Sequence, residues 1–201
     1  MIHIIDYGAG NLSSILNMMK RIGSEAKLVS DVKELKNATK IVLPGVGHFD
    51  HGMKQLQNSG MIELLNEKVM MDEVPILGIC LGAQMMCKGS EEVNFEGLSW
   101  FDAEVIKFEV IENRRIPHMG WNYVRQHKDS ILANNLPEDP RFYFVHSYHM
   151  VSNQQQDVLF NTNYGYDFVS GLHYNNRFAC QFHPEKSHKF GIQMFKNFAE
   201  L

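Results

Sequence analysis

Apolar residues in the first half of the chain follow two periods that alternate along the sequence. Short apolar runs at residues 2–5, 26–29, 41–43 and 75–79 have the length of buried strands. Residues 12–22 instead carry an apolar residue every three or four positions, which is the spacing of one helix face. Strands and helices that alternate in this way predict an α/β fold with a mostly parallel sheet covered by helices.

The remaining periodic segments extend this architecture. Helical spacing fills roughly residues 49–72 and 81–88, and residues 190–201 place apolar side chains on one face of a final helix. Short strands are expected in the second half at residues 105–108, 142–145 and 177–182. Without an internal repeat or a linker, residues 1–201 should form one domain. We expect an open, twisted, mostly parallel sheet flanked by helices, with a smaller antiparallel portion.

Composition and charge narrow the range of partners. The formal net charge is -4, from 19 Lys and Arg against 23 Asp and Glu, and the basic residues form no long run. This charge distribution does not indicate binding to nucleic acid or to an anionic membrane. Small molecules and proteins are therefore the expected partners. No stretch approaches the roughly 18 apolar residues of a membrane span, and the first residues do not resemble a signal peptide. The sequence therefore predicts a cytoplasmic protein.

Cysteines and histidines do not form the patterns of a metal site. Cys80, Cys87 and Cys180 contain no CxxC pair and are odd in number, which argues against a disulfide framework and a thiolate zinc site. His146 and His149 are three apart on an expected strand, a spacing that tends to place them on opposite faces. For these histidines we favour a structural or substrate-side role. We predict no metal and no cofactor.

The segment Gly78-Ile-Cys-Leu-Gly82 has the form of a nucleophile elbow with cysteine in place of serine. A sharp turn between a buried strand and a helix is strained, which accounts for the flanking glycines, and it directs Cys80 to the ligand-binding edge of the sheet. The amino end of the following helix favours a thiolate. These five residues alone fit a small buried cysteine equally well, so other motifs must decide.

A second motif, Phe182-His-Pro-Glu185, follows an expected strand near the end of the chain. His183 can take a proton from a thiol and return it to a leaving amine, and Glu185 can orient the imidazole ring. Alone, this segment is more often a structural turn. In a chain that also carries the cysteine elbow, it predicts a Cys–His–Glu triad.

A third motif, Pro44-Gly-Val-Gly47, comes directly after the strand expected at residues 41–43. Backbone N–H groups of a glycine-rich turn can point at a developing oxyanion, and the amide of Leu81 is the natural second donor. An ordinary connection between a strand and a helix is the alternative for this segment.

Taken together, Pro44–Gly47, Gly78–Gln84 and Gln181–Ser187 resemble a class I glutamine amidotransferase over nearly the whole chain. The resemblance implies that Cys80 is the nucleophile, His183 the general base and acid, and Glu185 its orienting partner. It also implies that glutamine is hydrolysed to glutamate and ammonia. The residues implied around the oxyanion and the substrate are Gly45, Val46, Gly47, Leu81, Gln84, His146, Ser147 and Tyr148.

Within that family, Asp6–Asn11, Pro117–Asn122 and Tyr143–Tyr148 resemble the glutaminase subunits of imidazole glycerol phosphate synthases. This resemblance implies a heterodimer with a cyclase subunit, a (βα)₈ barrel, that uses the ammonia to make imidazole glycerol phosphate and AICAR in histidine biosynthesis. The positions implied at the interface are Asn11, Met119, Trp121, Asn122 and Lys186. A core position is the alternative for Trp121.

Two segments depart from the subfamily, and the second leaves the acceptor of the ammonia open. Ser99 stands where a glycine is usual, and Ser187–Gly191 resembles paralogues that serve nucleotide-sugar or surface-polysaccharide amidation. An inactive regulatory subunit and an unrelated thiol hydrolase are further alternatives. The intact set of Cys80, His183 and Glu185 favours an active glutaminase over the inactive subunit, and the Phe182-His-Pro-Glu-Lys186 string is not explained by an unrelated thiol hydrolase.

Overall fold

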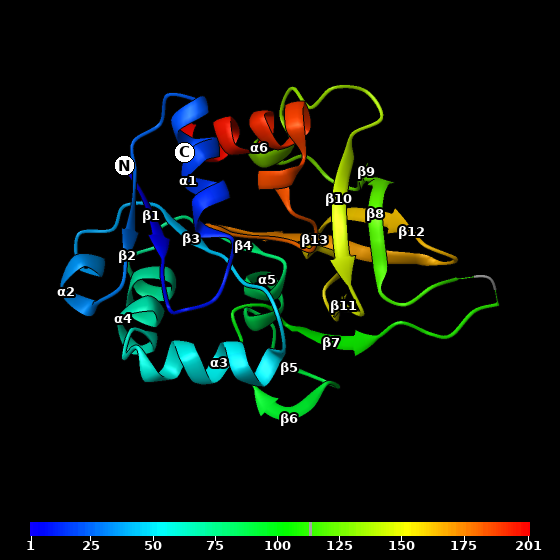
Figure 1. Cartoon of the computed structure of the whole chain (residues 1–201), viewed down its shortest axis with the longest axis horizontal. Helices are drawn as coiled ribbons and strands as arrows, with labels where there is room; N and C mark the ends of the chain where they lie inside the picture. The colour runs from blue at the N-terminus through cyan, green and yellow to red at the C-terminus, as the bar shows by residue number, and fades with distance from the viewer. Residues whose placement is uncertain (113) are drawn as a thin grey trace.

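The computed structural model describes residues 1–112 and 114–201, and in them a parallel sheet forms one half of the molecule (Figure 1). Its strand order is β2–β1–β3–β4–β14. These strands are β1 (Ile2–Ile5), β2 (Ala26–Val29), β3 (Ile41–Leu43), β4 (Ile76–Ile79) and β14 (Arg177–Cys180). The strands expected in the first half of the chain are therefore confirmed. The last strand, β14, comes from the far end of the sequence and pairs in parallel with β4.

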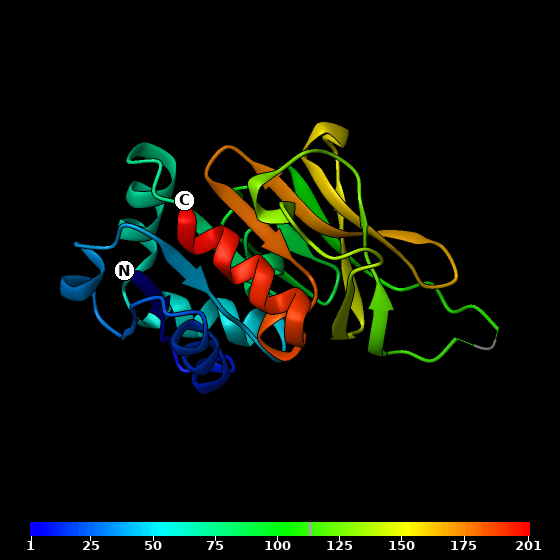
Figure 2. The ribbon, with the colours of Figure 1, turned by 90° about the horizontal axis from the view of Figure 1, so that it is seen from above.

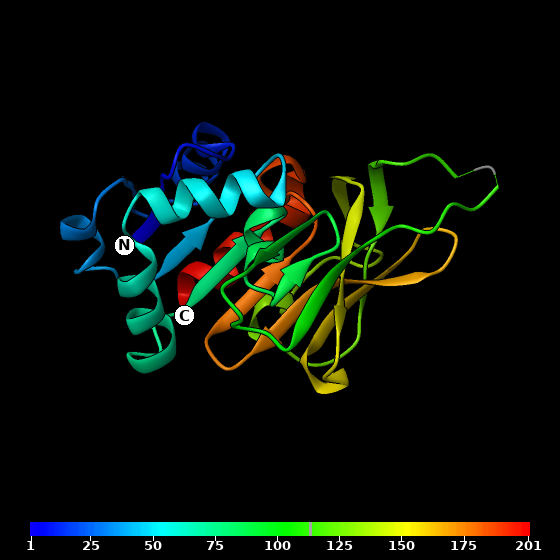
Figure 3. The same ribbon diagram turned by 90° about the horizontal axis from the view of Figure 1, so that it is seen from below.

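Helices cover both faces of this parallel region, as the apolar periodicity predicts. They are α1 (Leu12–Arg21), α2 (Val32–Leu35), α3 (Phe49–Asn58), α4 (Ile62–Asn66), the π-helical turn η1 (Glu67–Met71), α5 (Leu81–Met85) and α6 (His188–Glu200). Helices α1 and α6 lie on one face of the sheet (Figure 2), and their buried side chains belong to one hydrophobic cluster. Helices α3, α4 and α5 lie on the other face (Figure 3), and their buried side chains belong to a second cluster. Among the described residues, no helix has the length and apolar composition required to cross a bilayer.

More strands continue the sheet beyond β14, in antiparallel pairs except for β5 with β7, which is parallel. They are β5 (Gly89–Ser90), β6 (Val93–Glu96), β7 (Ala103–Lys107), β9 (Arg125–Gln126), β11 (Tyr148–Ser152), β12 (Val158–Asn163) and β13 (Asp167–Tyr174). A separate antiparallel pair joins β8 (His118–Tyr123) to β10 (Arg141–His146). Three short 3₁₀ turns are η2 (Ile131–Ala133), η3 (Gln155–Asp157) and η4 (Pro184–Lys186). The predicted α/β class, with a mostly parallel central sheet, flanking helices and antiparallel strands, is confirmed.

Three local predictions were wrong in extent or type. The helical stretch expected over residues 49–72 is broken after α3, where Gly60 adopts φ 69°. The helix expected to reach Lys88 ends at Met85. No strand was expected over Met119–Asn122, but this segment lies in strand β8 because it pairs in register with β10. Long-range pairing decided this last assignment.

Candidate active site

Cys80 occupies a strained turn between β4 and α5. Its backbone has φ 53° and ψ -110°, a conformation that residues other than glycine rarely adopt. Cys80 N donates to Cys180 O at 2.8 Å, and Gln84 N donates to Cys80 O at 3.1 Å. The neighbouring strand and the following helix therefore hold the turn from both sides.

The flanking glycines are required for a different reason from the one expected. The positive φ belongs to Cys80 itself, not to Gly78 or Gly82. A Cβ atom on Gly82 would lie 1.9 Å from Leu43 O, and one on Gly78 would lie 2.4 Å from Met86 Sδ. These glycines allow neighbouring segments to approach the turn closely.

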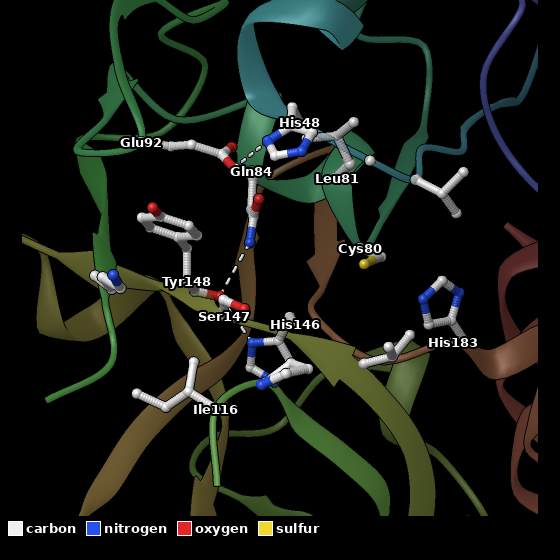
Figure 4. A pocket seen from close by; sticks show the side chains of 15 residues that line it. His48, Cys80, Leu81, Gln84, Glu92, Ile116, His146, Ser147, Tyr148 and His183 are labelled. Carbon is white, nitrogen blue, oxygen red and sulfur yellow. Dashed lines mark hydrogen bonds and ion pairs between the residues drawn. The ribbon is translucent and has the colours of Figure 1, made fainter. Parts of the chain in front are cut away.

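His183 and Glu185 form a buried, hydrogen-bonded pair beyond the end of β14. His183 Nδ1 lies 2.8 Å from Glu185 Oε1, and each side chain is 1% exposed. His183 N donates to Tyr143 O at 2.8 Å, which ties the turn to β10. Within the described part of the chain, His183 Nε2 has no hydrogen-bond partner, and this ring faces Cys80 (Figure 4). The geometry leaves Nε2 available for proton exchange with the sulfur or with a substrate.

The electrostatic surroundings favour a protonated His183. Burial alone would lower its pKa, but the Cys80 thiolate and the Glu185 carboxylate outweigh burial and raise the pKa of His183 to about 10. The imidazolium can therefore stabilise a thiolate and supply a proton to a leaving amine.

The glycine turn after β3 lies beside the cysteine elbow. Tyr7 Oη donates to Pro44 O at 2.6 Å, and a Cβ atom on Gly45 would lie 2.6 Å from Gly82 N. Its other end is open: Val46 is 42% exposed and a Cβ atom on Gly47, at φ 99°, would meet nothing within 4 Å. One end of the turn is packed against the elbow, whereas the other faces the cavity and solvent.

A cavity of about 600 Å³ joins these motifs (Figure 4). Of the residues expected at the site, the cavity is lined by Val46, Gly47, Cys80, Leu81, Gln84, His146, Ser147, Tyr148 and His183. Gly45, at the packed end of the glycine turn, and Glu185, hydrogen-bonded to His183, do not line the cavity. The structure therefore brings together in one pocket residues that are more than 100 positions apart in the sequence.

Gln84 is held in one orientation at the wall of the cavity. Its Nε2 donates to Tyr148 O at 3.1 Å and to Gln181 Oε1 at 3.0 Å, so both amide hydrogens are used within the protein. Its Oε1 is the polar atom that remains for a ligand.

Charged side chains on the far wall were missed by the sequence analysis. Glu92 lines the cavity with one carboxylate oxygen 2.8 Å from His48 Nδ1 and the other accepting from Phe49 N at 2.8 Å. Lys107 supplies a positive charge to the same cavity. Pairing of β5 with β7 brings these segments together, and no local motif marks either residue.

His146 and His149 do not lie on opposite faces of one strand, as had been expected. They belong to β10 and β11, which are separated at Ser147, and both rings pack against Phe108 with centroid distances of 5.1 and 4.7 Å. Among the described residues, no group of three or more His, Cys, Asp or Glu side chains is arranged to hold a metal ion.

The positions expected at the partner interface lie on more than one element. Met119 and Trp121 are 62% and 45% exposed on β8, which excludes a core position for Trp121. Lys186 Nζ lies 5.5 Å from the ring centroid of Tyr143 on the neighbouring strand. Asn122, on the same strand as Trp121, instead directs its amide to His118 and to a main-chain oxygen. Asn11 is the N-cap residue of α1.

A cysteine on a strained strand-to-helix turn, facing a histidine that a carboxylate orients, defines a site for thiol-dependent hydrolysis or transfer. The sequence model of the family "Glutamine amidotransferase class-I" matches residues 3–201. The chain belongs to this family.

Full-length relatives share much of the sequence. "Imidazole glycerol phosphate synthase subunit HisH 2" of Pseudomonas aeruginosa is 48% identical over 201 residues, covering 100% of both chains. A protein with the same name from Methanococcus maripaludis is 46% identical and covers 98% of both. Among solved structures, "Structure of PurLQS from Thermotoga maritima" superposes with a TM-score of 0.77 at 16% identity, covering 99% of this chain and 97% of that chain. This last likeness is one of fold.

Proposed function

We propose that the chain is the glutaminase subunit of an imidazole glycerol phosphate synthase. It hydrolyses L-glutamine to glutamate and ammonia, and a cyclase subunit consumes the ammonia to form imidazole glycerol phosphate and AICAR in histidine biosynthesis. The observation that carries this proposal is the Cys80, His183 and Glu185 arrangement in a chain 48% identical, over its full length, to a protein named as such a subunit. The expected setting is the cytoplasm.

The proposed reaction uses these groups in two steps. Cys80 Sγ attacks the side-chain amide carbon of glutamine, and the amides of Val46 and Leu81 stabilise the oxyanion. His183 gives a proton to the nitrogen, the C–N bond breaks, and ammonia leaves a glutamyl thioester. His183 then takes a proton from water, which attacks the thioester and releases glutamate and Cys80.

Recognition of glutamine falls to the other end of the cavity. An α-amino acid carries one ammonium and one carboxylate, and the cavity wall presents the carboxylate of Glu92 and the ammonium of Lys107. Gln84 Oε1 and the Ser147–Tyr148 segment complete this end of the pocket. We therefore assign Glu92 to the α-ammonium group and Lys107 to the α-carboxylate group.

The partner is proposed to be a (βα)₈-barrel cyclase bound through Asn11, Met119, Trp121, Asn122 and Lys186. Ammonia released without a waiting acceptor would be lost to water, so hydrolysis should be slow in the lone chain and faster in the complex. Reorientation of an amide in Gly45–Gly47 toward the oxyanion would supply about 3 kcal/mol, or roughly a hundredfold in rate.

The test compares the chain alone with its complex with the cyclase, with and without the acceptor. The expected result is slow hydrolysis alone and acceleration of about a hundredfold in the complex. Lys186→Glu should weaken that acceleration while leaving the melting temperature nearly unchanged, with exposed Lys189→Glu as the matched control. Full activity in the lone chain would contradict the proposal. Activation by a sugar-amidating synthase instead of the cyclase would identify the paralogue.

A further inference from the structure

A line of hydrogen-bonded polar side chains, buried at His118 and His146, runs from strand β8 to the wall of the cavity. Asn122 Nδ2 donates to His118 Nε2 at 3.2 Å, and His118 Nδ1 lies 3.0 Å from His146 Nε2. His146 Nδ1 lies 2.7 Å from Tyr148 O. Neither Asn122 nor His118 lines the cavity, whereas His146 and Tyr148 do. The line therefore connects residues outside the pocket to residues within it.

At the β8 end of the line, the hydrogen bonds of Asn122 fix which ring nitrogen of His118 is unprotonated. Tyr123 N donates to Asn122 Oδ1 at 2.8 Å, which identifies that atom as the amide oxygen. Asn122 Nδ2 must then be the NH₂ group, and it also donates to Asn163 O at 2.8 Å. His118 Nε2 consequently accepts a hydrogen bond and carries no proton.

At the cavity end, the hydrogen bonds of His146 lead independently to the same direction of donation, from His118 to His146. Tyr148 O can only accept, so His146 Nδ1 carries a proton and donates to it. A neutral His146 then has a lone pair on Nε2, which accepts from His118 Nδ1. Burial lowers the pKa of His118 to about 4 and that of His146 well below its usual value, which keeps both rings neutral at physiological pH.

The surroundings leave His118 little freedom to rotate. Its ring is stacked between Phe144, at 4.6 Å and 27°, and Tyr164, at 4.0 Å and 28°. His118 is 2% exposed and His146 is 6% exposed. A donor or acceptor that lost its partner here would have no ready access to water. The hydrogen bonds of the line therefore support one another.

The same carbonyl continues the line toward the nucleophile. Tyr148 O also accepts from Gln84 Nε2 (Figure 4), and that nitrogen donates to Gln181 Oε1. Gln181 Nε2 in turn lies 3.8 Å from Cys80 Sγ, a distance at which it can donate weakly to sulfur. Tyr148 O is thus the point at which the histidine line and the substrate wall meet.

We propose that His118 and Asn122 are positioning residues for L-glutamine, acting through His146 to hold the Ser147–Tyr148 segment and Gln84 in their binding geometry. Neither side chain touches the substrate. Their loss should therefore raise KM more than it lowers kcat. This kinetic consequence rests on the proposed glutaminase function, whereas the tautomers that the line requires can be measured without turnover.

The first experiment measures the imidazole ¹⁵N resonances of the whole chain. Both His118 and His146 should be neutral and carry their proton on Nδ1 at pH 7. A proton on Nε2 of either ring, or a charged ring, would overturn the inference whatever the enzymatic activity.

The second experiment compares two variants of nearly equal size in the complex at saturating cyclase. His118→Leu removes the donor to His146 and should raise KM for glutamine about tenfold, with kcat changed by less than about threefold. His118→Asn places its amide nitrogen close to the former Nδ1 position, restores the donor and should recover most of that loss. Equal KM values for the two variants would overturn the inference.

Asn122→Leu provides a variant at the surface end of the line. It should raise KM about threefold, because the donor to His118 is lost while the bond between the imidazoles remains. Asn161→Leu makes the same change on β12, outside the line, and should leave KM unchanged. An unchanged KM in Asn122→Leu would remove Asn122 from the proposal. An inactive wild-type complex would count against the proposed function itself, which distinguishes the two failures.

Discussion

The Cys80 side of the cavity and the Val46–Gly47 side differ in how firmly they are held. The cysteine elbow is tied by main-chain hydrogen bonds to Cys180 and Gln84, and the His183–Glu185 pair behind it is almost fully buried. The glycine turn is packed only at its Pro44–Gly45 end, and Val46 is 42% exposed.

This difference suits the two sides of the cavity to different roles: the Cys80 side to bond making and the Val46–Gly47 side to regulation. Covalent catalysis requires the sulfur and the imidazole to stay within a narrow range of positions, which the hydrogen bonds and close glycine contacts impose. A segment with few contacts can instead change conformation at low free-energy cost, because little packing is lost. The glycine turn is therefore the part of the site best suited to respond to a partner.

The largest effect is expected on the firmly held side. Cys80→Ala should reduce glutamine hydrolysis at least about 10⁴-fold, because no other group in the cavity replaces the nucleophile. The melting temperature should change little, and the complex should still make product from ammonium salts. Retained glutamine turnover, measured as glutamate release, would remove Cys80 from the mechanism.

Within the same side, the two members of the buried pair should differ. His183→Ala should approach the loss seen in Cys80→Ala, since it removes the group that transfers protons. Glu185→Gln should retain about a hundredfold more activity than His183→Ala, because an orienting group contributes less than the base it positions. Steady-state kcat/KM of the complexes tests this order, and equal tolerance of both changes would exclude the triad.

On the Val46–Gly47 side, adding one methyl group should be enough to alter activation by the cyclase. Gly47→Ala meets no atom within 4 Å but places a Cβ on a residue with φ 99°, at a cost of about 1 kcal/mol. Gly23→Ala imposes a similar strain at φ 74°, also in open space, and serves as the matched control. Both variants should lose similar stability in thermal unfolding. Only Gly47→Ala should reduce activation by the cyclase, by about tenfold, and equal activation of the two variants would refute a responsive turn.

The last prediction concerns the dependence of stability on pH. The pKa of His183 rises from 6.5 to about 10 on folding, so its contribution to stability is complete below pH 6.5 and is lost as the pH rises through 10. The free energy of unfolding of wild type minus that of His183→Ala should therefore decrease between pH 6.5 and 10. Denaturant titrations at several pH values measure it, and a difference that grows with pH would contradict the protonated His183.

Local patterns identified the parts of the site that lie at strand ends. Pro44–Gly47, Cys80 and His183–Glu185 each follow an apolar run that forms a parallel strand, and parallel strands end at one edge of the sheet. The order of strands and helices in the first half of the chain could also be predicted from the sequence, because each element has its own apolar period and length. For these features, residues close in sequence supply the determining interactions.

Tertiary structure decided the far wall of the cavity and the line of hydrogen bonds behind it. Glu92 and Lys107 line the same cavity only because β5 pairs with β7, and His118 meets His146 only because β8 pairs with β10. The sequence by itself determined the candidate triad of Cys80, His183 and Glu185 and the sheet edge that carries it. Which polar groups face one another across strands depended on register, and register is set by pairing and packing between distant segments that no local pattern encodes.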